Sequence, residues 1–379
     1  MRVSPGLDTL WLAKRLVLLL ATLLLNACAG LGPGYYWQAA KGQMDMLNKA
    51  QPIEAVLADP ATTPEMRSRL LLVEQIRSYA SRELGLPDND SYRSYANIGR
   101  ASVVWNVYAN PPLSMQPRTW CPPVVGCVGY LGFFSEADAQ KRANELKADG
   151  LDTLVGSVPA YSTLGWFPDA VLSTFINWPD ASLAELLFHE LSHQLIYAKG
   201  DTEFNESFAS TVEQVGVRRW LTQYGKQDAI AQLARSERMS ADFATLVLKH
   251  RELLIAIYTG PGSDADKLER KRLQIAAMRA EYQTIKAERW GGVPGYDRWF
   301  AQDINNATFA SVGFYRGLVP GFMAVLAQQE GDLTKFYAEV RRLAALTPAE
   351  RRAALKASEA AVAASVAEPG AARSSLGQF

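Results

Sequence analysis

Two histidines and a glutamate stand at the spacing of a metal site. The segment Phe188-His189-Glu190-Leu191-Ser192-His193 contains the pattern His-Glu-x-x-His, in a chain with only three histidines. Residues four apart on a helix lie about one turn along and ~40° around the axis, so both imidazoles can reach one cation. Two imidazoles and a carboxylate suit zinc and leave a position open for water. The pattern therefore predicts one Zn²⁺ per chain on His189 and His193, with Glu190 as general acid and base.

The motif lies in a segment with helical periodicity, residues 182–198. Its leucines form a wide apolar face, which predicts a buried helix. Ser182 and Glu185 have the spacing of a capping box at the start, and Gly200 suits the stop. We therefore expect Glu185 to cap this helix.

A third metal ligand follows from the next helix, expected over residues 204–222. Residues 198–202 form a short turn, so this helix should return antiparallel to the first. At about 1.5 Å per residue, Glu206 comes level with His193 on the way back. Glu206 is thus the predicted third ligand, with a solvent-facing helical glutamate as the alternative. Glu213 shares its helix face and is predicted to orient a ligand histidine.

Three further residues are weaker candidates. The oxyanion formed during hydrolysis needs a hydrogen-bond donor. Tyr161, in an expected strand before the motif, and Tyr315 are the candidates, with packed tyrosines as the alternative. His250 stands between Lys249 and Arg251, which favours a surface residue.

The elements that must position these residues indicate an α+β fold that is mostly helical. Residues 103–108, 128–134 and 152–161 are rich in β-branched and aromatic residues and predict a small sheet. Helices are expected at 36–57, 64–84 with Thr63 as cap, from Ser135 onward, and at 318–329 and 331–345. The sheet is expected to pack on the helical body that carries the motif. The segments 226–258 and 265–290, separated by Gly260-Pro261-Gly262, predict a long helical hairpin.

The N-terminus has the pattern of an export signal. Basic residues precede an apolar run of about ten residues, which is too short for a span of ~20 residues. Leu25-Asn26-Ala27-Cys28 resembles a bacterial lipobox, in which the cysteine is lipidated and becomes the first residue. We expect a lipoprotein tied to a membrane through Cys28, on the periplasmic face and preferably of the outer membrane. An ordinary signal peptide with a chance cysteine is the alternative.

The expected organisation follows the chain in order. Residues 1–27 form the signal peptide and 28–35 a tether, and 36–360 form the metal-binding region. Its parts are an N-terminal helical part (36–100), a sheet part (101–167), the motif helices (180–225), the hairpin (226–290) and C-terminal helices (291–350). The Ala- and Ser-rich residues 361–379 are expected to form a flexible tail.

Composition limits the classes of partner. The chain has 39 basic and 39 acidic residues among 379. With no surplus positive charge to neutralise phosphates, nucleic-acid binding is not expected. Three cysteines are too few for a disulfide scaffold, but export would allow Cys121 and Cys127 to pair across a turn-rich loop. Two free buried cysteines are the alternative.

The segments around the motif resemble a bacterial family of predicted aminopeptidases, and the glutamate ligand resembles the glutamate-zincin metallopeptidases. The similarity is carried by residues 160–167, 188–194 and 199–209, by Trp120-Cys121, Gly126-Cys127 and Asn305-Asn306-Ala307, and by the lipoprotein start. The resemblance implies a zinc-dependent exopeptidase on His189, His193 and Glu206, with Glu190 as catalytic acid and base. The Gly-x-Met-Glu-Asn stretch that holds the substrate amine in well-known zinc aminopeptidases does not occur here.

Two functions from different classes are consistent with these residues. The first is a membrane-anchored zinc peptidase, with a peptide as its substrate. The second is an envelope lipoprotein with a structural zinc that serves as a binding or scaffold module. Structural zinc sites usually have four protein ligands, and the sequence offers no obvious fourth ligand. The sequence leaves the oligomeric state and the substrate sequence open.

Overall fold

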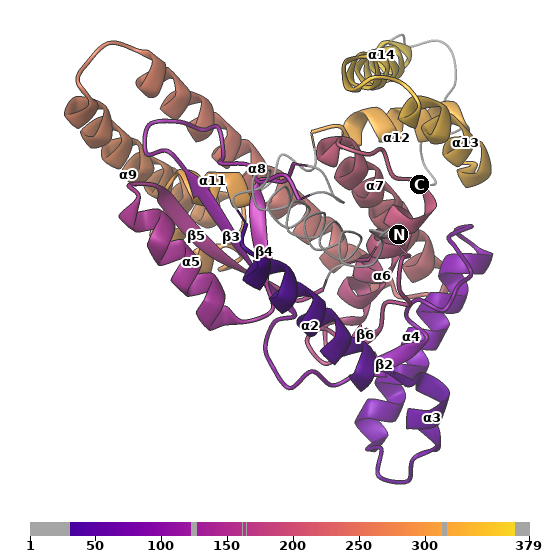
Figure 1. Ribbon diagram of the computed structural model, residues 1–379. Coiled ribbons are helices and arrows are strands. Elements are labelled where there is room, and N and C mark those ends of the chain that lie inside the picture. The colour runs from indigo at the N-terminus through magenta and orange to yellow at the C-terminus, as the bar shows by residue number, and fades with distance from the viewer. Residues whose placement is uncertain (1–30, 123–126, 161, 164, 313–316, 368–379) are drawn as a thin grey trace, which may run out of the picture.

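The computed structural model describes residues 31–122, 127–160, 162–163, 165–312 and 317–367. These residues form the predicted α+β fold, mostly helical with two small sheets (Figure 1). The helices are α2 (Pro33–Lys49), α3 (Ile53–Ala58), α4 (Pro64–Arg82), α5 (Glu136–Ala148), α6 (Asp180–Leu195), α7 (Thr202–Gln223), α8 (Gln227–Thr259), α9 (Asp264–Glu288), α10 (Asp297–Ala301), α11 (Asn306–Ser311), α12 (Val319–Gln328), α13 (Leu333–Ala344) and α14 (Pro348–Ala367). The strands are β1 (Gln51–Pro52), β2 (Ser94–Ala96), β3 (Val104–Asn110), β4 (Tyr130–Phe133), β5 (Asp152–Val158) and β6 (Val171–Leu172).

The predicted small sheet is confirmed, in the order β4-β3-β5. Both pairings are antiparallel, and Val107 lies opposite Leu131 on one side and Val155 on the other. Alternate residues of β3, Trp105, Val107 and Ala109, are buried in one cluster with residues of α5. The sheet therefore has a covered face, as the period-two pattern of a half-buried strand requires. The third strand ends at Val158, three residues before the expected limit.

A second sheet, in the order β1-β2-β6, was not expected. It divides the helix predicted over residues 36–57 into α2 and α3. The backbone of Ala50 is extended, and Gln51–Pro52 pairs with Ser94–Tyr95. The residue before a proline is disfavoured in the helical region, which explains why the helix ends here.

The largest core lies among the helices. Buried residues from α4, α6, α7, α12, α13 and α14 form one cluster with those of β2 and β6. In Figure 1, α6 and α7 lie in the middle of the molecule, with α12–α14 on one side and α2–α4 below. The predicted caps of the α4 and α5 helices are confirmed, because Thr63 accepts from the Met66 amide and Ser135 from the Asp138 amide.

The predicted long hairpin is formed by α8 and α9, which project from the body beside the β3–β5 sheet (Figure 1). The hairpin shares a separate core with α10 and α11. It is attached to the sheet by the ammonium of Lys271, which lies 2.5 Å from Asp152 and 2.9 Å from the Pro112 carbonyl. The expectation that His250 is a surface residue is wrong. Its side chain is buried within the hairpin, where its ring contacts Glu281 and Gln274.

The expected limits of tether and tail need correction. The α2 helix begins at Pro33, inside the expected tether of residues 28–35, and Pro is favoured at the first position of a helix. The α14 helix continues to Ala367, past the expected boundary at residue 361, because its alanines favour a helix. The structure joins Cys121 and Cys127 in a disulfide. In the described part of the chain, no helix has the length and apolar character needed to span a membrane.

Four predictions fall outside the described residues. The signal peptide with Cys28, the two candidate oxyanion donors Tyr161 and Tyr315, and the last part of the tail lie in the ranges 1–30, 161, 313–316 and 368–379.

Candidate functional site

The start of α6 is fixed by long-range contacts. The helix begins at Asp180 after Pro179, so Ser182 lies inside it and the predicted capping box is wrong. Arg69 of α4 donates to the carboxylate of Asp180 at 2.7 Å and to the carbonyls of Ile176 and Trp178. Lys226, the residue directly before α8, donates to the other oxygen of Asp180 at 2.8 Å. These charges hold the helix that carries the histidines.

The α7 helix returns along α6, as predicted. The α6 helix ends at Leu195, earlier than the expected stop at Gly200, and Gly200 lies in the turn with φ +79°. The Asn205 side chain fixes this turn by bonding both the amide and the carbonyl of Ala198. Close approach of the two helices requires Gly216, where a Cβ atom would lie 2.9 Å from the Phe188 ring.

The three predicted ligand side chains converge between α6 and α7. The Nε2 atoms of His189 and His193 are 3.2 Å apart. The carboxylate of Glu206 lies 3.3 Å from the first Nε2 atom and 3.7 Å from the second. A tetrahedral cation ~2.0–2.1 Å from each ligand atom would separate these atoms by about 3.3 Å. Histidine and carboxylate donors at these distances fit a zinc ion, and all three candidate atoms lie within 4.8 Å of one another.

Glu213 contacts the His189 ring at its Nδ1 atom. The Nδ1 atom of His189 donates to Glu213 at 2.9 Å, because an ionised carboxylate can only accept. This bond directs the Nε2 atom of the ring toward His193 and Glu206, as a residue that orients a metal ligand would do. The Nδ1 atom of His193 is buried and has no partner among the described residues.

The pKa values of the two histidine rings are shifted in opposite directions. Burial alone would lower the pKa of His189, but its hydrogen bonds to Glu206 and Glu213 outweigh burial and raise the pKa well above 6.5. Burial and the neighbouring charge of His189 lower the pKa of His193 to about 4. Burial opposes the ionisation of Glu206, yet its hydrogen bond to His189 lowers its pKa. Without a cation, these shifts favour the imidazolium form of His189 and the neutral form of His193, which keeps an electron pair to donate.

Glu190 lines a cavity of about 590 Å³ next to the three converging side chains. His189, Glu213 and Glu185 also line it, and Trp178 and Leu186 form an apolar part of its wall. Burial raises the pKa of Glu190 to about 7, with His189 opposing this shift and the carboxylates of Glu206, Asp169 and Glu213 adding to it. A carboxylate with a pKa near neutrality suits both acceptance and return of a proton.

Sequence reasoning did not assign two residues to the surroundings of Glu190. Glu185, expected to cap the helix, lines the cavity instead, because α6 starts two residues earlier than predicted. Tyr92 is buried in the left-handed region with φ 62°, and its hydroxyl has no partner among the described residues. Burial and the nearby carboxylates of Glu190 and Asp169 raise its pKa. A tyrosine in this backbone region is uncommon, and no sequence pattern signals it.

Comparison with known proteins places the chain in a family. No curated protein and no solved structure matches it. A family described as "Putative aminopeptidase" matches residues 34–355 of the 379, a range that includes the histidine helix, its returning partner and the helical hairpin. Because this match covers most of the chain, the protein belongs to the putative aminopeptidase family.

Proposed function

We propose that the protein is a zinc-dependent aminopeptidase of the glutamate-zincin type. The observation that carries the proposal is the convergence of His189, His193 and Glu206 within 4.8 Å, beside a cavity that Glu190 lines. The family match supports a peptidase in general. The zinc and the ligand roles of the three side chains are inferred from the geometry.

The reaction would divide between the ion and the chain. His189, His193 and Glu206 would hold a zinc ion, which would supply Lewis-acid chemistry at the scissile bond. The carboxylate of Glu190 accepts the proton of the attacking water and then returns it to the leaving amine. Glu213 holds His189 in the orientation that presents Nε2.

The walls of the cavity favour a peptide with a free amino terminus. Glu185, Glu190 and Glu213 line it, and no lysine or arginine is among its described lining residues. Acidic side chains beside a scissile bond attract an ammonium group, and this arrangement supports the aminopeptidase part of the proposal. Trp178 and Leu186 supply an apolar surface for a side chain of the substrate.

The test combines metal analysis with digestion of a peptide library. We expect one zinc ion per chain, cleavage that a chelator abolishes, and cuts confined to the first residue. N-acetylation of the peptides should prevent cleavage. The Glu190→Gln variant should keep its zinc and lose at least 100-fold in activity, the scale of general acid–base catalysis.

Three outcomes would contradict the proposal. A protein that binds no zinc would remove the metal centre, and full activity in Glu190→Gln would remove Glu190 from the mechanism. A protein that binds zinc and cleaves no peptide in the library would favour a scaffold role in the cell envelope.

We also propose that the chain is a lipoprotein, exported and anchored through Cys28 to the periplasmic face of a membrane. The proposal rests on the lipobox-like sequence Leu25-Asn26-Ala27-Cys28. Several acyl chains together hold a protein durably at a membrane. Labelling of cells with a radioactive fatty acid should mark the protein and not its Cys28→Ala variant. Equal labelling of both would refute the anchor, and membrane fractionation would show whether the outer membrane is its location.

A further inference from the structure

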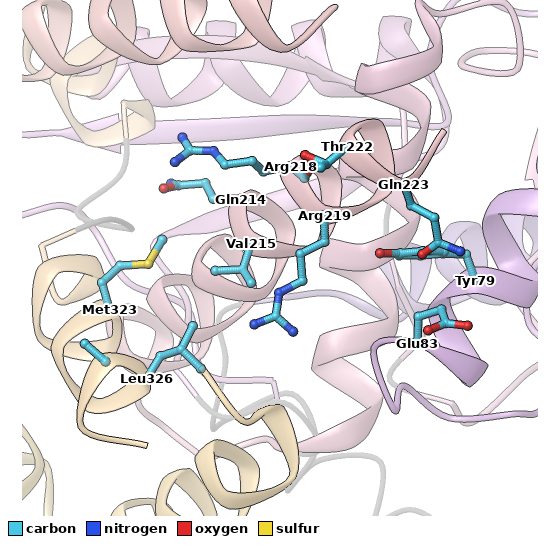
Figure 2. A pocket seen from close by; sticks show the side chains of 11 residues that line it. Tyr79, Glu83, Gln214, Val215, Arg218, Arg219, Thr222, Gln223, Met323 and Leu326 are labelled. Atoms are coloured by element: carbon cyan, nitrogen blue, oxygen red, sulfur yellow. Dashed lines mark hydrogen bonds between the residues drawn. The ribbon is translucent and has the colours of Figure 1, made fainter. Parts of the chain in front are cut away.

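A second cavity lies on the side of α7 that faces away from the histidines. Glu206 and Glu213 project from one face of α7 toward α6, whereas Val215 and Thr222 lie about 180° around the helix and face this cavity. The cavity has a volume of about 540 Å³ and is enclosed by α7, α12 and α4 (Figure 2). This volume falls in the range of small-molecule sites.

One part of the cavity wall is apolar. Val215 of α7 and Met323, Leu326 and Ala327 of α12 form it. Leu326 is buried, while Met323 and Ala327 are half-buried, so the apolar surface extends from the core to the opening. A ligand with an apolar body would cover this surface.

Two arginines line the same cavity but differ in their partners. Arg218 donates to Glu237 at 2.8 Å, so its charge is compensated. Arg219 donates to the Gly331 carbonyl at 2.7 Å and forms no ion pair with any residue that the structure describes. In Figure 2 the Arg219 side chain extends into the space between Leu326 and Glu83, whereas Arg218 points toward Gln214. The guanidinium of Arg219 is half-buried and pairs with no anion among the described residues, so a ligand anion in the cavity would gain a charged partner.

We propose that this cavity binds a small carboxylate with an apolar body. The carboxylate pairs with the guanidinium of Arg219, whose planar donors match two carboxylate oxygens. The apolar body lies against Val215, Met323 and Leu326. The site is separate from the metal centre, and its occupation does not depend on the peptidase function.

The first experiment compares ligands of one shape and different charge on the full-length protein. Octanoate, octanamide and octylammonium carry the same apolar chain and differ at the head group. Isothermal titration should show octanoate binding at least tenfold more tightly than octanamide, with octylammonium weakest. Because carboxylates also bind metals, the titration is repeated after chelation. Equal affinities for octanoate and octanamide, or loss of octanoate binding on chelation, would overturn the proposal.

The second experiment uses the two neighbouring arginines as a matched pair. Arg219→Gln should abolish the preference for octanoate over octanamide, whereas Arg218→Gln should keep it within threefold. Arg219→Lys retains the positive charge and should keep part of the preference, which guards against a glutamine variant that fails to fold. A preference unchanged in Arg219→Gln, or lost equally in both glutamine variants, would show that Arg219 does not bind the anion.

Glu83, which also lines the cavity, allows an experiment to distinguish a simple alkyl carboxylate from a free amino acid as the ligand. Hexanoate and norleucine share the carboxylate and the alkyl chain, and norleucine adds an α-ammonium group. Tighter binding of norleucine that disappears in Glu83→Gln would identify a free amino acid as the ligand. Equal or weaker binding of norleucine would identify a simple alkyl carboxylate. Absence of binding by both would refute the site.

Discussion

Replacement of Glu213 by glutamine tests whether this residue orients a metal ligand. The Glu213 carboxylate accepts from Nδ1 of His189 at 2.9 Å, and its side chain is only 14% exposed. A hydrogen bond to a charged group contributes about 1.5–3 kcal/mol, against about 1 kcal/mol for a neutral pair. Glutamine keeps an acceptor oxygen of similar size but loses the charge, so the loss should be about 0.5–2 kcal/mol. At 1.4 kcal/mol per tenfold change, the zinc dissociation constant should rise roughly 2- to 30-fold.

The assay is a zinc titration in competition with a chromophoric chelator. Glu213→Ala removes the acceptor altogether and should weaken zinc binding by up to about 100-fold. Glu203→Gln is the matched control, because Glu203 lies on the same helix and pairs with Arg352 at 2.6 Å, away from the histidines. Zinc affinity within twofold of the wild type in Glu213→Gln, or an equal loss in Glu203→Gln, would refute the assigned role of Glu213.

Three further predictions concern stability, each measured as the free energy of unfolding in urea. Gly216→Ala places a Cβ atom 2.7 Å from Leu84. The overpacking cost of ~1–3 kcal/mol should exceed the ~1 kcal/mol gain in helix propensity, so the variant should be less stable. A more stable variant would show that the methyl group fits between the helices without overpacking. Tyr92→Phe removes a buried hydroxyl that has no partner among the described residues, and it should stabilise the fold by about 1 kcal/mol. A loss of stability would reveal a bond to that hydroxyl. Arg351→Met leaves the buried carboxylate of Asp201 without its ion-pair partner and should cost ~3–5 kcal/mol of stability. Adding Asp201→Asn to this variant should recover part of the loss. Equal stability of Arg351→Met and the wild type would show that the pair contributes nothing.

The convergence of the three candidate ligands could be predicted because it depends on local rules. The spacing of His189 and His193 on one helix fixes their relative direction, whatever surrounds the helix. Glu206 required only one more step, a short turn followed by an antiparallel helix. The expected role of Glu185 was wrong because the start of α6 is set by Arg69 and Lys226, which are distant in sequence.

The elements that were missed are those with little local pattern. The β2 and β6 strands contain three and two residues, too few to show alternation. They are ordered by pairing with each other across about 75 residues of sequence, as in the register Tyr95–Val171. The cavity beside Arg219 could not be predicted for the same reason, since its walls come from three helices whose packing is tertiary.

The burial of α7 gives a physical reason to expect a cation at the site. Residues on all sides of this helix are buried, yet the carboxyl groups of Glu206 and Glu213 lie along it next to the histidines. Against these two groups stands one protonated ring, His189, because the lowered pKa of His193 keeps that ring neutral near pH 7. A buried surplus of negative charge is costly unless a counter-charge accompanies it. A divalent cation among the converging atoms would supply that charge, and its binding would displace the proton from His189.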